Sequence, residues 1–202
     1  MDERRRKFRK RTAHGSGFSL TELVVALAIA LILMAIGMPS FLTAYRSYQL
    51  SNAAIRMAEI LRLTRYEAIR LNKPVGCVVQ PSTTDPTMTA AWVDSNMNSI
   101  ADPTEKIILL GPAGNLVDSG SVPGAGALPA QANLSGATPT TPSVSGATVL
   151  FDARGAVTPP NVNVFYLASG IPDPGFRAVI LMPAGSIQIW TGDASGNWQQ
   201  LR

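Results

Sequence analysis

The residues in front of the longest apolar stretch of the chain have an order that favours proteolytic processing. Gly15, Ser16 and Gly17 come directly before Phe18, and Glu22 stands at the entrance of residues 23–38, which contain no charged side chain. An ordinary secretory signal has its small-residue cleavage site after the apolar core. Here the small residues precede the core. The order therefore predicts a leader that is removed on the cytoplasmic side, while the apolar stretch is retained.

Glu22 is the acidic residue of this segment, and its position predicts that its carboxylate pairs with a cation. A carboxylate inside a bilayer is costly unless a cation is paired with it. A neighbouring subunit that supplies a cation removes this cost, so Glu22 favours one particular stagger between subunits. The alternative is an acid at the level of the lipid headgroups that has no partner.

A third group of residues has the spacing of a calcium-binding loop. Side chains with oxygen atoms occupy positions 1, 3, 5, 9 and 12 of a twelve-residue window: Asp94, Asn96, Asn98, Asp102 and Glu105. These are the ligand positions of an EF-hand loop, and Ile100 could offer its carbonyl at position 7. Ser99 replaces the glycine usually found at position 6, and a strand rather than a helix is expected afterwards. The alternative is a solvated turn rich in Asp and Asn.

The remaining reactive residues argue against an enzyme. The single cysteine, Cys77, lies in an apolar run and is interpreted as a buried core residue. The single histidine, His14, lies in the basic leader. The rest of the chain therefore lacks the commonest general base and the commonest metal ligand, and no nucleophile–base pair stands out. We expect no catalytic site and no cofactor.

The leader and the apolar stretch together predict a membrane anchor. Residues 1–17 hold seven basic and two acidic side chains, whereas the rest of the chain has ten basic and eleven acidic ones. Positive charge stays in the cytoplasm, so residues 18–39 should cross the inner membrane once, with the N-terminus cytoplasmic and the C-terminal part outside. A helix of 22 residues is about 33 Å long, enough to span the hydrocarbon core of a bilayer.

The elements beyond the anchor predict an α+β fold. Residues 40–73 have an apolar stripe with helical spacing (Leu50, Ala54, Met57, Leu61 and Ala68), so one helix should run from about residue 18 to 71, with a kink or local melting at Pro39. Residues 74–202 predict a head of antiparallel strands at 75–80, 88–94, 106–110, 147–151, 162–168, 176–182, 186–191 and 198–201. The last three should form a meander. Residues 119–147 are rich in small residues and predict a flexible insertion with little to bury.

These features resemble a known superfamily. Residues 17–22, the apolar run and Pro39 are similar to the motif of type IV prepilins and type II secretion pseudopilins. The resemblance implies that prepilin peptidase cuts between Gly17 and Phe18 and methylates the new amino group of Phe18, and that Glu22 pairs with the N-terminal amine of a neighbouring subunit. Residues 63–75, residues 94–109 and residues 151–155 resemble the GspH/FimT family of minor pseudopilins and minor pilins.

The resemblance implies a structural function. The chain would join other pilins or pseudopilins at an inner-membrane assembly platform. It would help to initiate or cap the filament of a type II secretion system, for protein secretion, or of a type IV pilus. An alternative is a FimT-like minor pilin that binds DNA for uptake. Only four basic residues follow position 100, so nucleic acid is an unlikely partner by charge.

Overall fold

The computed structural model describes residues 18–111, 115–134, 139–143, 145–169 and 175–201. The chain divides into two compact units, Met1–Ser40 and Phe41–Arg202. One helix, α1 (Leu20–Leu71), runs from the first unit into the second and passes through Pro39 without interruption. The expected local melting at Pro39 is therefore wrong. A proline inside a helix removes one backbone donor, and the helix tolerates that loss here.

The end of α1 has a clear cause in the sequence. Asn72 adopts a positive φ of 48°. The Asn72 N–H donates to the Ile69 carbonyl, and the Lys73 N–H donates to the Ala68 carbonyl. These two bonds form a Schellman motif, which satisfies carbonyls that the helix leaves free. Pro74 follows and cannot continue the helix. The predicted end at residues 72–74 is confirmed.

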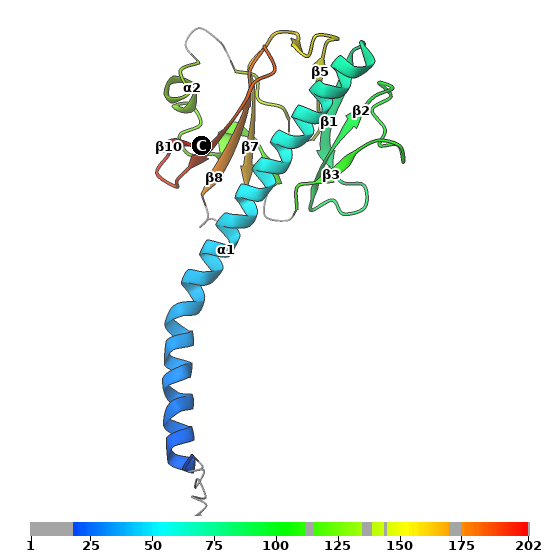
Figure 1. Cartoon of the computed structure of the whole chain (residues 1–202). Helices are drawn as coiled ribbons and strands as arrows, with labels where there is room; N and C mark the ends of the chain where they lie inside the picture. The colour runs from blue at the N-terminus through cyan, green and yellow to red at the C-terminus, as the bar shows by residue number, and fades with distance from the viewer. Residues whose placement is uncertain (1–17, 112–114, 135–138, 144, 170–174, 202) are drawn as a thin grey trace, which may run out of the picture. The chain divides into compact units, whose positions relative to one another are not determined.

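Among the described residues, ten strands form two antiparallel sheets (Figure 1). The first sheet has the order β3-β2-β1-β5-β6. Its strands are β1 (Val75–Pro81), β2 (Thr89–Asp94), β3 (Ile107–Leu109), β5 (Ala147–Phe151) and β6 (Val157–Thr158). The second sheet has the order β10-β9-β8-β7-β4. Its strands are β4 (Asn115–Val117), β7 (Asn163–Ala168), β8 (Phe176–Leu181), β9 (Ile187–Gly192) and β10 (Trp198–Leu201). The predicted meander of the last three strands is confirmed.

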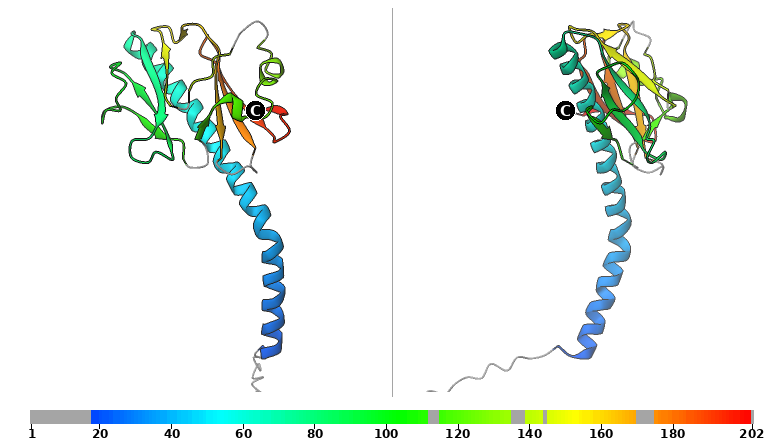
Figure 2. Two further views of the ribbon diagram at one scale, coloured as in Figure 1. Left: turned by 180° about the vertical axis from the view of Figure 1, so that it is seen from behind. Right: turned by 90° about the vertical axis from the view of Figure 1, so that its right-hand side faces the viewer.

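The part of α1 that belongs to the second unit lies across both sheets (Figures 1 and 2). The predicted stripe is buried at every position: Leu50, Ala54, Met57, Leu61 and Ala68. These side chains share one core with Val79 and Phe151 of the first sheet and with Leu167 and Val179 of the second. The fold is therefore α+β, as predicted, with the helix as the common cover of two sheets.

Residues 119–147 differ from the expectation of a flexible insertion with little to bury. The described part contains a short 3-10 helix, η1 (Ser119–Ser121), and α2 (Leu128–Gln131). Val122, Leu128 and Leu134 are buried in a second core, on the face of the β10–β4 sheet that carries Tyr166 and Trp198. The expectation of little to bury is wrong, because a few apolar side chains, spaced among small residues, are enough to cover the two aromatic rings. The flexibility of the insertion stays a prediction.

Two strands were not predicted, β4 and β6, because they contain only three and two residues. Runs this short carry no period-2 pattern to detect. The other strands lie within one or two residues of the predicted ranges.

Candidate functional site

The segment predicted to be processed lies at the start of α1. Gly17 is outside the described residues. Phe18 is 81% exposed and precedes the first helical residue, Leu20. Ser19 stands between them and acts as the N-cap: its Oγ accepts a hydrogen bond from the Glu22 N–H at 3.2 Å, and its carbonyl accepts one from the Leu23 N–H at 3.1 Å. The helix therefore begins directly after the residue that would become the mature N-terminus.

Glu22 occupies the third helical position after this cap. Ser19 and Glu22 have the Ser-x-x-Glu spacing of a capping box, in which serine accepts from the backbone of the acidic residue. A negative charge in the first turn also interacts favourably with the helix dipole. The sequence carried this signal, but our sequence analysis missed it. The backbone N–H of Glu22 thus completes the Ser19 cap, and its side chain contributes a negative charge in the first turn.

The apolar residues after Glu22 are exposed in the part of the chain that the structure describes. Leu23, Ile32 and Met38 are each 60% exposed or more. In the described residues, α1 is the one helix that is long and apolar enough to cross a membrane, with a mean hydropathy of 2.5 in its most apolar window and none of that window buried. Sixteen residues of exposed hydrocarbon require cover from lipid or from other subunits.

The loop at residues 94–105 folds on its own hydrogen bonds. The carboxylate of Asp94 is buried and accepts from the N–H groups of Asn98 and Ser99 at 3.1 and 2.8 Å. Glu105 accepts from the Ser95 N–H, and Asp102 accepts from the side-chain amides of Asn96 and Asn98. Within the described ranges, no group of three or more His, Cys, Asp or Glu residues is arranged to hold a metal ion. These hydrogen bonds form a turn rich in Asp and Asn, and calcium binding by the loop stays a prediction.

Cys77 is buried in β1, as predicted. Burial raises the pKa of its thiol to about 12, with the Thr64 hydroxyl acting in the opposite direction. A thiol of this kind is almost entirely protonated at neutral pH and is a poor nucleophile. Cys77 is therefore a core residue.

Two family models match the chain. The model described as type II transport protein GspH matches residues 53–185, and the prokaryotic N-terminal methylation motif matches residues 14–38. The first match covers the part of α1 from residue 53 onward, all strands of the first sheet, and β4, β7 and β8 of the second sheet. The second covers the cap, Glu22 and the apolar stretch. None of the curated proteins matches this chain.

The solved structures that resemble the chain include two crystal forms of the type IV minor pilin FimU from Pseudomonas aeruginosa. The P21 form has 15% sequence identity and a TM-score of 0.47, and the match covers 75% of this chain and 93% of FimU. The P65 form has 19% identity and a TM-score of 0.46, and the match covers 74% and 97%.

The GspH match extends over more than half of the chain, and the methylation motif at residues 14–38 lies on its N-terminal side. This family consists of structural pilin and pseudopilin subunits and is not a family of enzymes. The chain belongs to the GspH family of the pilin and pseudopilin superfamily.

Proposed function

We propose that this chain is a minor pseudopilin that is inserted in the inner membrane as a prepilin and then assembled near the tip of a type II secretion filament. Prepilin peptidase cuts between Gly17 and Phe18 and methylates Phe18. The helix then passes from the bilayer into the filament, where the carboxylate of Glu22 pairs with the N-terminal amine of a neighbouring subunit. The leader keeps the N-terminus in the cytoplasm, and the head lies outside the membrane.

One observation carries this proposal: the methylation motif stands directly in front of an apolar helix with no cover of its own. A leader cut at Gly17 leaves that helix intact. A cut after the apolar stretch would remove it. Retention of an uncovered apolar helix is useful only to a protein that keeps it in lipid or among other helices.

The part of α1 in the second unit also has an exposed apolar face that the head leaves uncovered. Tyr45, Tyr48 and Tyr66 are each half exposed or more, and their spacing places them on the side of the helix opposite to the buried stripe. The rings of Phe41 and Tyr45 stack with centroids 6.4 Å apart. Aromatic residues are enriched at protein interfaces, so this face suits contact with neighbouring subunits.

The processing step is tested by intact mass and N-terminal analysis of the chain from a host that has prepilin peptidase. We expect methylated Phe18 as the first residue. Replacement of Gly17 by a bulky residue, Gly17→Trp, should leave the leader attached, and Gly17→Ala should be milder. A mature N-terminus after the apolar stretch, near Gly37, would overturn the proposal.

Deletion of the gene in its own host separates secretion from pilus assembly. A pseudopilin is required for export of secreted proteins, so the deletion should leave those proteins inside the cell, and the intact gene should restore export. Loss of surface pili with normal export would instead assign the chain to a type IV pilus.

A further inference from the structure

A row of side chains crosses the second sheet and changes from apolar to polar at Arg177. Leu167 of β7 pairs with Arg177 of β8, Arg177 pairs with Thr191 of β9, and Thr191 pairs with Gln199 of β10. Residues directly opposite on antiparallel strands point to the same face, and Leu167 belongs to the core under α1. The row therefore places a cation where that core ends.

Arg177 is almost completely buried, at 5% exposure. Its Nε donates to Ser51 Oγ at 3.1 Å, its Nη2 to Ser47 Oγ at 2.9 Å and its Nη1 to the Phe176 carbonyl at 2.9 Å. All three acceptors are neutral. Within the part of the chain that the structure describes, no carboxylate forms an ion pair with Arg177, and the ion pair found there joins Glu67 and Arg70.

A buried guanidinium without a counterion is energetically unfavourable. Burial lowers the pKa of Arg177 because it removes water from the charged form. Arginine nevertheless stays protonated in proteins, so the charge remains, and none of the described residues supplies a counterion for it. A guanidinium has five N–H donors, and the hydrogen bonds to Ser47, Ser51 and Phe176 leave at least one of them without an acceptor in the described residues.

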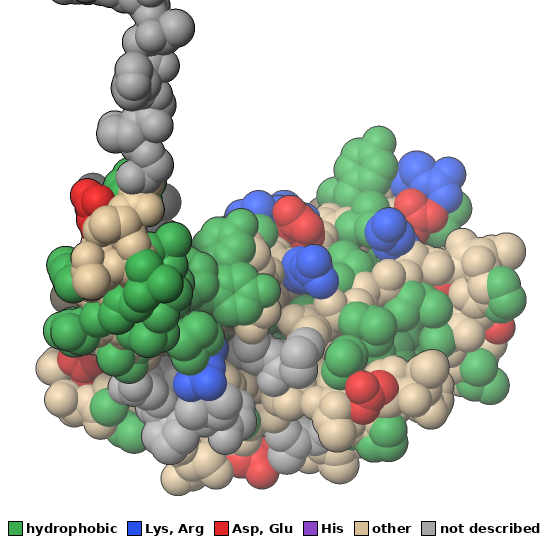
Figure 3. All heavy atoms as spheres, turned by 90° about the horizontal axis from the view of Figure 1, so that it is seen from below, with side chains coloured by type: hydrophobic (Ala, Val, Ile, Leu, Met, Phe, Trp, Pro, Cys, Tyr) green, Lys and Arg blue, Asp and Glu red, His purple; other side chains and the backbone are tan. Residues whose placement is uncertain are grey.

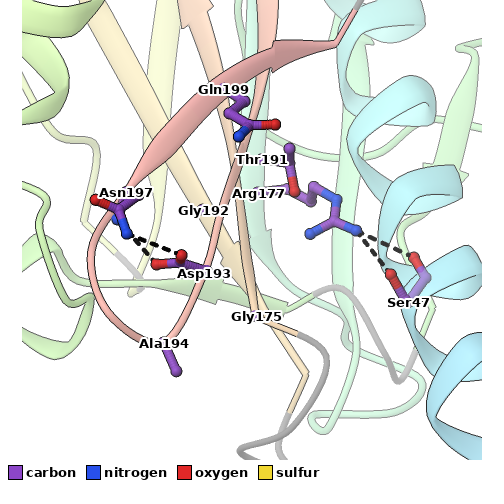
Figure 4. A pocket seen from close by; sticks show the side chains of 9 residues that line it. All are labelled: Ser47, Gly175, Arg177, Thr191, Gly192, Asp193, Ala194, Asn197 and Gln199. Atoms are coloured by element: carbon purple, nitrogen blue, oxygen red, sulfur yellow. Dashed lines mark hydrogen bonds between the residues drawn. The ribbon is translucent and has the colours of Figure 1, made fainter. Parts of the chain in front are cut away.

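A hollow of about 330 Å³ opens beside this group (Figure 4). Its other polar lining includes Thr191, Asn197 and Gln199. Figure 4 shows one edge of the guanidinium bonded to Ser47 and another nitrogen directed away from α1, toward the turn between β9 and β10. Asp193 also lines the hollow, but its carboxylate accepts from the backbone N–H groups of Ser195 and Asn197 and from the Asn197 side chain.

We propose that this hollow is a binding site for a single carboxylate group, which pairs with Arg177 and contacts Thr191 and Gln199. The charge favours a carboxylate over a phosphate or sulfate. One buried cation is neutralised by one negative charge, whereas a dianion would leave excess charge beside Asp193. The hydroxyl of Thr191 and the amide of Gln199 add neutral donors to the oxygens of the ligand.

The test uses two thiol reagents of similar size, iodoacetate and the neutral iodoacetamide, on the full chain in an uncharged detergent. In both reactions the thiolate displaces iodide and forms a thioether. Gln199→Cys places a thiol in the hollow, and Gln200→Cys is the matched control because Gln200 pairs with Trp190 and points to the other face. Cys77 is 0% exposed and should not react.

We expect the rate ratio of iodoacetate to iodoacetamide to be at least about threefold higher at Gln199→Cys than at the control. A local potential of one kT concentrates an anion by this factor. Added acetate should lower the ratio relative to chloride at the same ionic strength. Equal ratios at the two positions would overturn the proposal.

A second variant should remove the preference for iodoacetate over iodoacetamide while Arg177 is retained. Thr191→Glu places a carboxylate directly opposite the guanidinium, within reach across the strand pair. In the Gln199→Cys background it should lower the rate ratio to the control value, whereas the uncharged Thr191→Gln should not. Arg177→Met should act like Thr191→Glu. If Thr191→Glu leaves the ratio unchanged, the site does not exist.

A second experiment distinguishes a free carboxylate from an acidic side chain of a neighbouring subunit. It rests on the proposed function. Protection of Gln199→Cys by acetate in the isolated chain identifies a site open to free carboxylates. Additional protection in membranes, present only when the other filament subunits are produced, identifies an acidic side chain of a neighbour as the occupant. Processing of the leader does not depend on Arg177, so failure here leaves the proposed function intact.

Discussion

Two properties of Glu22 coincide at one position, a negative charge and a role in the helix cap. The Ser19 cap accepts the Glu22 N–H, and the charge lies in the first turn of α1. A glutamine keeps the spacing and polarity that a capping box requires but carries no charge. Glu22→Gln and Glu22→Leu therefore separate the local role from the proposed role between subunits.

We expect both Glu22 variants to be produced, inserted and cleaved, since removal of a charge eases membrane insertion. Both should be incorporated poorly into filaments, measured as the amount that copurifies with the partner pilins. If Glu22→Gln assembles normally and only Glu22→Leu fails, capping and not charge pairing explains the requirement. Normal assembly of both variants would exclude either role.

The buried thiol of Cys77 predicts how the stability of the head depends on pH. Burial raises the pKa of Cys77 from 9.0 to about 12, so the unfolded chain loses this proton before the folded chain does. The contribution is fully present below pH 9 and is lost as the pH rises toward 12. The slope approaches about 1.4 kcal/mol per pH unit.

Urea unfolding at pH 7, 9 and 10 measures this slope, with Cys77→Ala as the control that lacks the thiol. Burial also raises the pKa of Tyr166, from 10.0 to about 12, so the comparison stays at or below pH 10. The native chain should lose more stability than Cys77→Ala between pH 9 and 10. Parallel losses in the two chains would mean that the thiol is not buried.

At the scale of elements, the contact of α1 with two turns depends on glycine. Gly155 and Gly185 both have a positive φ, 78° and 79°, and Arg65 of α1 lies over them. A Cβ on Gly185 would lie 2.5 Å from the Gly155 carbonyl oxygen and 2.8 Å from Arg65 Nε. Arg65 also donates to the Gly185 carbonyl. This contact, which we call the Arg65 crossing, fixes α1 to the turn between β8 and β9.

Three glycine-to-alanine changes separate backbone strain from steric clash. Gly126 has no positive φ and no atom within 4 Å of a new Cβ, so Gly126→Ala should be near neutral. Gly111 has a φ of 85° and open space, so Gly111→Ala should cost about 1–2 kcal/mol. Gly185→Ala combines strain with a clash against backbone and should cost about 2–4 kcal/mol. Denaturant unfolding gives this order, and equal costs at Gly111 and Gly185 would contradict the Arg65 crossing.

At the scale of the whole molecule, the charge balance argues against strong binding of nucleic acid. The leader holds seven basic and two acidic side chains, and the rest of the chain has ten basic and eleven acidic side chains. On the face in Figure 3, basic side chains lie beside acidic and apolar ones and form no single field. Duplex DNA binds mainly through phosphate neutralisation, so this charge balance predicts weak binding.

A truncated chain that begins at Ser47 tests both the fold and this charge argument. The buried stripe of α1 starts at Leu50, so the chain keeps the cover of both sheets and should unfold cooperatively in urea. Its binding to a DNA duplex should be weak and should disappear at moderate salt, as measured by a gel shift or a fluorescence titration. Submicromolar affinity at physiological salt would favour the alternative function in DNA uptake.

The sequence alone determined the features that depend on local order along the chain. The small residues before the apolar stretch, the acid at its entrance and the stripe from Leu50 to Ala68 are patterns within one helix, where spacing translates directly into a face. The helix end at Asn72 was also readable, because Pro74 excludes its continuation. The strand meander followed from alternating runs and turn residues.

The tertiary structure decided what depends on distant segments. The residues around Leu128 were expected to bury little, because nothing near them in the sequence indicated that they cover Tyr166 and Trp198. Arg177 looked like an ordinary strand residue, and only strand pairing placed it against Ser47 and Ser51 with Thr191 opposite. A sequence gives the type of each side chain, but burial and missing counterions arise from segments more than a hundred residues apart.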